Sequence, residues 1–108
     1  MSIYGAWTSA VIALGETVSA AADLGRDFEY LEIVIPTQTS ATIGLQVGTN
    51  PAGGALAYKT LGIGSNVTAA TTGNCVTTLE LGGYRHVKVV SGTAQDAAET
   101  YYVRGYRL

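Results

Sequence analysis

Two stretches decide the fold, Tyr30-Leu-Glu-Ile-Val-Ile-Pro36 and Thr42-Ile-Gly-Leu-Gln-Val-Gly48. In the first, Leu31, Ile33 and Ile35 point to one side of an extended chain, and the closing proline ends the ladder because it lacks an N–H. The second repeats the alternation of apolar residues with polar or small ones. A period of two is typical of strands that bury one face. Both stretches are therefore predicted to be strands with one apolar face.

Turn residues divide the remaining sequence into similar short segments. Clusters such as Asn50-Pro-Ala-Gly-Gly54 and Gly82-Gly83 recur, at a spacing of roughly 8–12 residues that is typical of a β-sandwich or barrel. The pattern predicts one all-β domain over residues 1–108, a jelly-roll-like antiparallel β-sandwich of eight or nine strands. Residues 1–14 form either an N-terminal arm or the first strand. The expected strands are 9–14, 17–24, 29–35, 41–48, 55–61, 66–71, 75–81, 84–91 and 98–106.

Composition excludes several classes of protein. The chain has 108 residues, 47% of them hydrophobic and 13% charged, with a net charge of −2 and one Cys. Disordered chains have the opposite balance, and a bilayer span needs about 20 apolar residues, whereas the apolar run that contains Val11–Leu14 is far shorter. A weakly acidic chain has no basic footprint for nucleic acid. Without a positively charged N-terminal segment of the secretory type, synthesis in a cytoplasm is expected.

The residues that could carry catalysis are few. His86 is the only histidine, and as an outward strand residue it is expected at the surface or in an interface. Cys75 is expected to be a packing residue. The acidic run over residues 23–32 is expected to be a solvated strand edge; a calcium site there is the alternative, although the run does not match an EF-hand loop. Asn66-Val-Thr68 matches the glycosylation pattern by coincidence. We therefore predict no enzyme, no cofactor and no catalytic or metal-binding residue.

Aromatic and basic side chains are expected to gather on the last two strands. Outward-facing Tyr84, His86 and Lys88 would form one row and outward-facing Tyr102, Arg104 and Tyr106 another. A hairpin through Ser91-Gly92 would place the rows side by side. Tyr and Arg are enriched in protein–protein hot spots, and Tyr rings also stack on sugars. Protein docking, glycan binding and a merely exposed strand face remain open readings.

The N-terminal segment adds a second apolar surface. This segment contains Trp7 together with other large apolar residues. Trp7 is expected either to cover an open end of the sandwich or to anchor the segment on another chain. The predicted partner interface therefore comprises Trp7, Tyr84, His86, Tyr102, Arg104 and Tyr106.

Several strings resemble a known family. They are Val18-Ser-Ala-Ala-Ala-Asp-Leu-Gly25, Leu31-Glu-Ile-Val-Ile-Pro36, Thr39-Ser-Ala-Thr-Ile-Gly-Leu-Gln-Val47, and Tyr84-Arg-His-Val-Lys-Val-Val-Ser-Gly92 followed by Gln95-Asp-Ala-Ala98. Together they resemble small β-sandwich structural proteins of tailed bacteriophages, over about residues 17–103. The resemblance implies a virion component without enzymatic activity.

The leading hypothesis is thus a bacteriophage virion structural protein. It would be a capsid decoration or cement protein that locks the head through many repeated contacts with the major capsid protein or other virion proteins. Homo-oligomerisation is expected, whereas nucleic acid and membrane are not expected as partners. The alternative is a carbohydrate-binding module of a phage tail or neck component, with a glycan as ligand.

Overall fold

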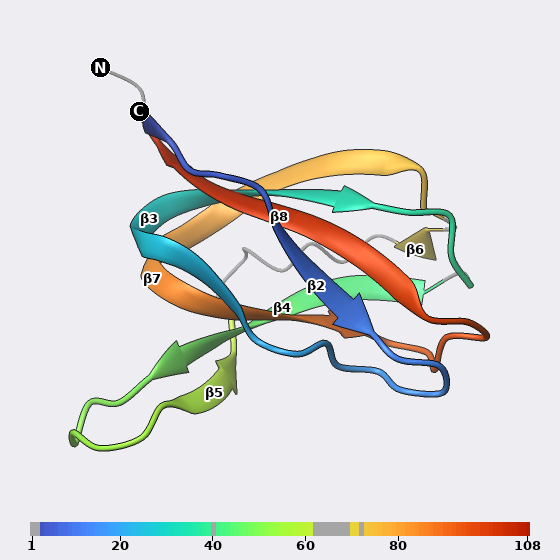
Figure 1. Cartoon of the computed structure of the whole chain (residues 1–108), viewed down its shortest axis with the longest axis horizontal. Coiled ribbons are helices and arrows are strands. Elements are labelled where there is room, and N and C mark those ends of the chain that lie inside the picture. The colour runs from blue at the N-terminus through green and yellow to red at the C-terminus, as the bar shows by residue number, and fades with distance from the viewer. Residues whose placement is uncertain (1–2, 40, 62–69, 72) are drawn as a thin grey trace.

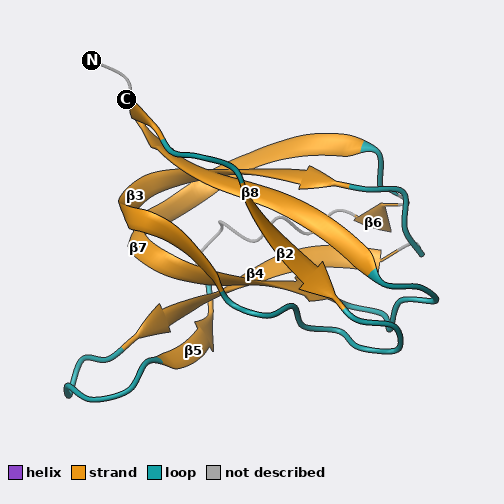
Figure 2. Cartoon of the chain, viewed as in Figure 1, coloured by secondary structure: helices purple, strands orange, loops and turns teal. Residues whose placement is uncertain are grey.

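A computed structural model of the chain describes residues 3–39, 41–61, 70–71 and 73–108. In this part every regular element is a strand (Figures 1 and 2). The strands are β1 (Ile3–Tyr4), β2 (Thr8–Ile12), β3 (Ala22–Ile35), β4 (Ala41–Thr49), β5 (Ala57–Thr60), β6 (Ala70–Thr71), β7 (Cys75–Ser91) and β8 (Glu99–Arg107). Most of the predicted strand 66–71 and the Asn66-Val-Thr68 pattern lie outside the described residues. No helix of the described part is long and apolar enough to cross a membrane.

The strands form two layers that share β3 and β7 (Figure 1). In the first layer, β8 lies between β2 and the second half of β3, β1 pairs with the far end of β8, and the first half of β7 lies beyond β3. In the second layer, the end of β7 lies between the start of β3 and β4, and β5 pairs with β4. Every one of these pairings is antiparallel. The predicted antiparallel β-sandwich is confirmed.

Two predicted strand breaks are bends inside longer strands. The pairing of β3 with β7 shifts register on both sides of Phe28, which marks β-bulges. Gly25 on β3 and Gly82 and Gly83 on β7 have φ angles of 89°, 80° and 92°. Glycine reaches this backbone region without steric cost, so each strand turns from one layer into the other without ending. The predictions of a break between strands 17–24 and 29–35 and of a break between strands 75–81 and 84–91 were therefore wrong.

The core lies between the layers and follows the predicted alternation. Leu31, Ile33 and Ile35 of β3 are fully or almost fully buried, as are the alternate residues Val87 and Val89 of β7. The inward residues of β4 and β8 complete this core. Each large apolar side chain buried in this way contributes roughly 1.5–3 kcal/mol, so the shared core holds the two layers together.

A buried tyrosine on β8 depends on a hydrogen bond inside the sandwich. The Tyr101 side chain is fully buried, and its hydroxyl donates to the Gln38 amide oxygen. Burial, with a smaller contribution from the Glu99 carboxylate, raises the pKa of Tyr101 from 10.0 to about 12. The folded state therefore holds the phenol proton more tightly than the unfolded state does.

This raised pKa predicts a specific loss of stability in alkali. When the pKa of a group rises on folding, its contribution to stability is complete at pH values below its pKa in the unfolded chain. That contribution is lost as the pH rises through its pKa in the folded protein. For Tyr101 the free energy of unfolding should be lower by about 1.4 kcal/mol at pH 11 than near neutral pH. Urea unfolding of the native protein and Tyr101→Phe at pH 8 and pH 11 measures this difference. An equal alkaline loss in both proteins would contradict the assignment.

Candidate functional site

The outer face of the first layer gathers aromatic side chains from both ends of the chain. Strand register places Tyr30 opposite Tyr106 and Glu32 opposite Arg104. Alternate residues of a strand share a face, so this register aligns two rows of outward side chains. We call this surface the aromatic face. It comprises Tyr4, Trp7, Tyr30, Tyr102, Arg104 and Tyr106.

Three of its rings form a ladder across the strands. The ring centroids of Tyr4 and Tyr106 are 5.5 Å apart with an interplanar angle of 19°, and those of Tyr30 and Tyr106 are 5.3 Å apart at 21°. Stacked rings of this kind add about 0.5–1.5 kcal/mol per pair beyond area burial. The ladder therefore fixes the orientation of three tyrosines that the sequence places on three different strands.

Arg104 connects this ladder to the N-terminal tryptophan. Its Nε lies 2.6 Å from Glu32 Oε1, and its Cζ lies 4.8 Å from the Tyr4 ring and 4.5 Å from the Trp7 ring. The side chains of Arg104 and Glu32 are only 27% and 20% exposed. A planar cation against two rings and one carboxylate combines cation–π attraction with an ion pair. Arg104 thus positions the rings around it.

The aromatic face remains open to solvent although it is ordered. Tyr4, Trp7 and Tyr102 are 54%, 45% and 48% exposed, and Val11 and Val76 flank them as exposed aliphatic residues. Among the described residues, the Tyr102 ring stacks on no other ring. The exposed half of this side chain is therefore available to a ligand.

Part of the predicted interface lies elsewhere. The predicted side-by-side rows were wrong, because β3 lies between β7 and β8 in the first layer and the end of β7 belongs to the second layer. The structure thus brings together Trp7, Tyr102, Arg104 and Tyr106 and separates them from His86 and Tyr84. Tyr84 is half-buried and packs against the core. Its strand partner Phe28 lies between two register shifts, so the inward and outward alternation of β7 does not continue through Tyr84.

His86 belongs to a small ionic cluster at the start of β3. Arg85 Nε lies 2.7 Å from Asp23 Oδ1, and His86 Nε2 lies 3.7 Å from Asp23 Oδ2. The hydrogen bond from Arg85, with a further one from the Gly25 amide, holds the pKa of Asp23 far below its usual range. Asp23 is half exposed, so solvent screens this pair and it contributes little to stability. No group of three or more His, Cys, Asp and Glu side chains within the described residues is placed to hold a metal ion.

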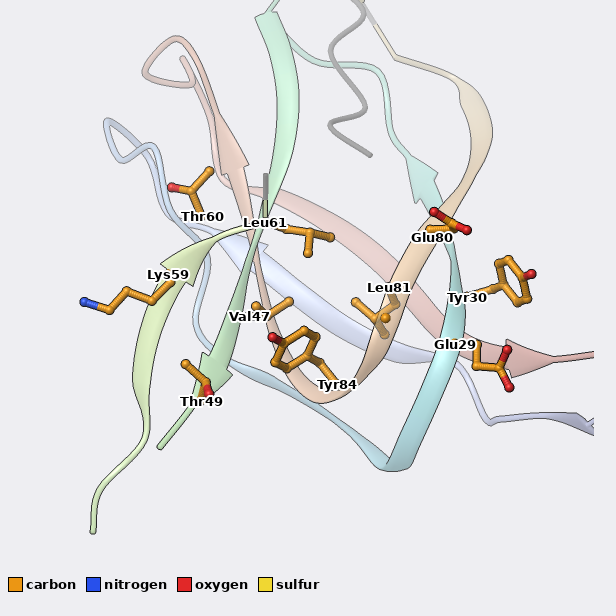
Figure 3. A pocket seen from close by; sticks show the side chains of 11 residues that line it. Glu29, Tyr30, Val47, Thr49, Lys59, Thr60, Leu61, Glu80, Leu81 and Tyr84 are labelled. Carbon is orange, nitrogen blue, oxygen red and sulfur yellow. The ribbon is translucent and has the colours of Figure 1, made fainter. Parts of the chain in front are cut away.

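A cleft opens between the two layers beside the aromatic face (Figure 3). Its volume is about 710 Å³. Apolar side chains from β4, from β7 and from Leu61, which directly follows β5, line its interior, with Tyr84 among them, and polar side chains surround them. The lining residues are Glu29, Tyr30, Val47, Thr49, Lys59, Thr60, Leu61, Glu80, Leu81, Gly82 and Tyr84.

The sequence alone does not identify two residues of the aromatic face, Tyr4 and Tyr30, or Glu32, the ion-pair partner of Arg104, as site residues. In the sequence, Tyr30 and Glu32 alternate with the apolar residues of their strand and Tyr4 is one large apolar residue near the N-terminus, so none of the three marks a site. The alternation already places Tyr30 and Glu32 on the outer face. The local pattern does not show which strand lies next to β3. Only the pairing of β3 with β8 brings Tyr106 beside Tyr30 and Arg104 beside Glu32.

Comparison with known proteins shows the fold. No protein-family model matches the chain, and no curated protein matches it. Among solved structures, it is similar to chitosan-binding module 1 of a chitosanase/glucanase from Paenibacillus sp. IK-5, at 16% identity and a TM-score of 0.56, over 90% of this chain and 76% of that one. It is also similar to CBM32-1 of a family 31 glycoside hydrolase from Clostridium perfringens, at 15% identity and a TM-score of 0.52, over 89% and 72%. This protein shares its β-sandwich fold with these modules.

Proposed function

We propose that this protein is a non-catalytic carbohydrate-binding module that holds glycans on its aromatic face. The observation that carries the proposal is the set of exposed rings, Tyr4, Trp7 and Tyr102. The tyrosine ladder orients Tyr4, and Arg104 lies against both Tyr4 and Trp7. A sugar ring has a flat apolar face of C–H groups and an edge of hydroxyls. Aromatic residues that are apolar in the body and polar at the tip suit both. The fold shared with two carbohydrate-binding modules supports the same class of ligand.

Preorganisation strengthens this proposal. A ligand that binds loose side chains must offset roughly 0.5–1.5 kcal/mol for each one that it immobilises. Here Tyr106 is stacked between two rings and Trp7 lies against Arg104 before any ligand arrives. A weakly interacting ligand such as a neutral sugar therefore loses little of its binding free energy to ordering the site.

The chain carries its own reporter for the test. Trp7 is the only tryptophan and lies on the aromatic face, so its fluorescence should change when oligosaccharides bind. Tyr102→Ala should lower glycan affinity about 10- to 100-fold, which is the range for removing an exposed anchor ring from a hot spot. Tyr58→Ala on β5 in the second layer is the matched control and should bind as the native protein does. Titration of an oligosaccharide panel measures both; equal affinities of the two variants would exclude the aromatic face as the site.

A second candidate function uses the same face to dock on protein. Exposed Val11 and Val76 beside the rings, and the Tyr, Trp and Arg composition, favour a protein partner. With the resemblance to tailed-phage sandwiches, this supports a capsid decoration or cement protein, present in the virion as a homo-oligomer on the major capsid protein. The test is to count this chain against the major capsid protein in gradient-purified particles. A near-stoichiometric ratio favours cement, a few copies favour a tail or neck component that binds glycans, and absence excludes the virion.

A further inference from the structure

The interlayer cleft combines an apolar interior with carboxylates on one rim. Val47, Leu61 and Leu81 line the interior and Tyr84 adds an aromatic surface (Figure 3). Pockets of this size with a few polar groups around apolar walls are typical of small-molecule sites. None of the functions considered above uses this cleft.

The charge of the cleft is negative on the side formed by β3 and β7. Glu29 and Glu80 lie on that rim, and neither forms an ion pair within the described part of the chain. Lys59 comes from β5 on the opposite side, and its amino group points away from both carboxylates (Figure 3). Two carboxylates without a neighbouring cation favour a ligand that brings a positive charge.

One tyrosine belongs to both surfaces. Tyr30 lines the cleft, and its ring stacks on Tyr106 at the end of the ladder. Tyr30 is also the strand partner of Glu80 on β7. The aromatic face therefore continues directly into the acidic rim, so one extended ligand can contact both.

We propose that the cleft selects glycans whose sugar units carry a protonated amine. This inference rests on the proposed carbohydrate-binding function and names its ligand class. A sugar unit stacked near Tyr30 would place its amine beside Glu80 or Glu29. Tyr30 and Glu29 point away from the cleft interior (Figure 3), so it is the neighbouring unit of the same glycan that would lie with its apolar face against Tyr84. Neutral and N-acetylated glycans have no charge to offer these carboxylates.

The test compares a glucosamine oligosaccharide with its N-acetylated form of equal length. Trp7 fluorescence and calorimetry measure both affinities at low and high salt. The amine form should bind more tightly, and added salt should reduce only this advantage because exposed charges are screened. Glu29→Gln/Glu80→Gln should lower affinity for the amine form about five- to tenfold and leave the acetylated form unchanged. Glu16→Gln, in the loop between β2 and β3, is the control for a lost negative charge and should bind as the native protein does.

The outcomes separate this inference from the function on which it rests. If both oligosaccharides bind equally and the double variant matches the control, the aromatic face still binds glycans and the selectivity of the cleft is overturned. If neither oligosaccharide binds the native protein, both proposals fail. Thermal unfolding of the double variant shows that it is folded, since both substitutions are at exposed positions.

Discussion

Replacing Gly105 with Ala is expected to lower the free energy of unfolding by about 3 kcal/mol, at the upper end of the range for overpacking a core. Gly105 lies on β8 with its α-carbon against the buried Phe28 ring, and an added methyl group would overlap three carbons of that side chain. Phe28 is 2% exposed and sits where the pairing of β3 with β7 shifts register. The overlap includes the Phe28 β-carbon, which is attached to the backbone of β3, so turning the ring cannot relieve it and the strands must separate.

Gly44→Ala on β4 is the matched control. A methyl group there meets nothing within 4 Å and needs no unusual backbone angle. This variant should be unchanged or more stable by up to about 1 kcal/mol, because alanine restricts the unfolded chain more than glycine does. Urea unfolding of the two variants at pH 7 measures the contrast. Equal stabilities would show that Phe28 has room that the described packing does not give it.

Arg104→Met is expected to disorder the aromatic face and to cost about 2 kcal/mol of unfolding free energy, since the Glu32 carboxylate, only 20% exposed, would lose its cation. Trp7 and Tyr4 would lose the guanidinium that lies between them and the strand. The Trp7 emission should therefore shift toward that of a solvated indole, and glycan affinity should fall about tenfold although Arg104 itself is largely covered.

Two further variants separate position from charge. Arg104→Met/Glu32→Gln removes the unpaired carboxylate, so stability should recover in part while the Trp7 emission stays shifted. Arg104→Lys keeps the charge but loses the planar group that stacks on the rings, and it should restore binding only partially. A native Trp7 emission in Arg104→Met would show that Arg104 does not position this side chain.

The local pattern predicted which residues face outward better than which strands are neighbours. Alternation placed Leu31 and Ile33 in the core and Tyr102 and Arg104 outside, because the side-chain period of a strand is a local property. Gly82-Gly83 was read as the end of a strand, since a turn and a bend both require glycine at positive φ. The pairing of β8 with β3 depends on contacts between segments far apart in the sequence, which explains why Tyr84 and His86, expected beside Tyr102 and Arg104, lie apart from them.

The position of β8 also determines when the protein can fold during synthesis. In the described residues β1 and β2 pair only with β8, and Ile3 lies opposite Arg107. β2 therefore has no strand partner until residues 99–103 have left the ribosome, and β1 has none until residues 106–107 have. Until then the edges of β2 and β3 are exposed to other chains, and pairing over such long separations in sequence is slow. The nascent chain thus depends on late closure, and truncation within β8 should yield an aggregating polypeptide instead of a smaller domain.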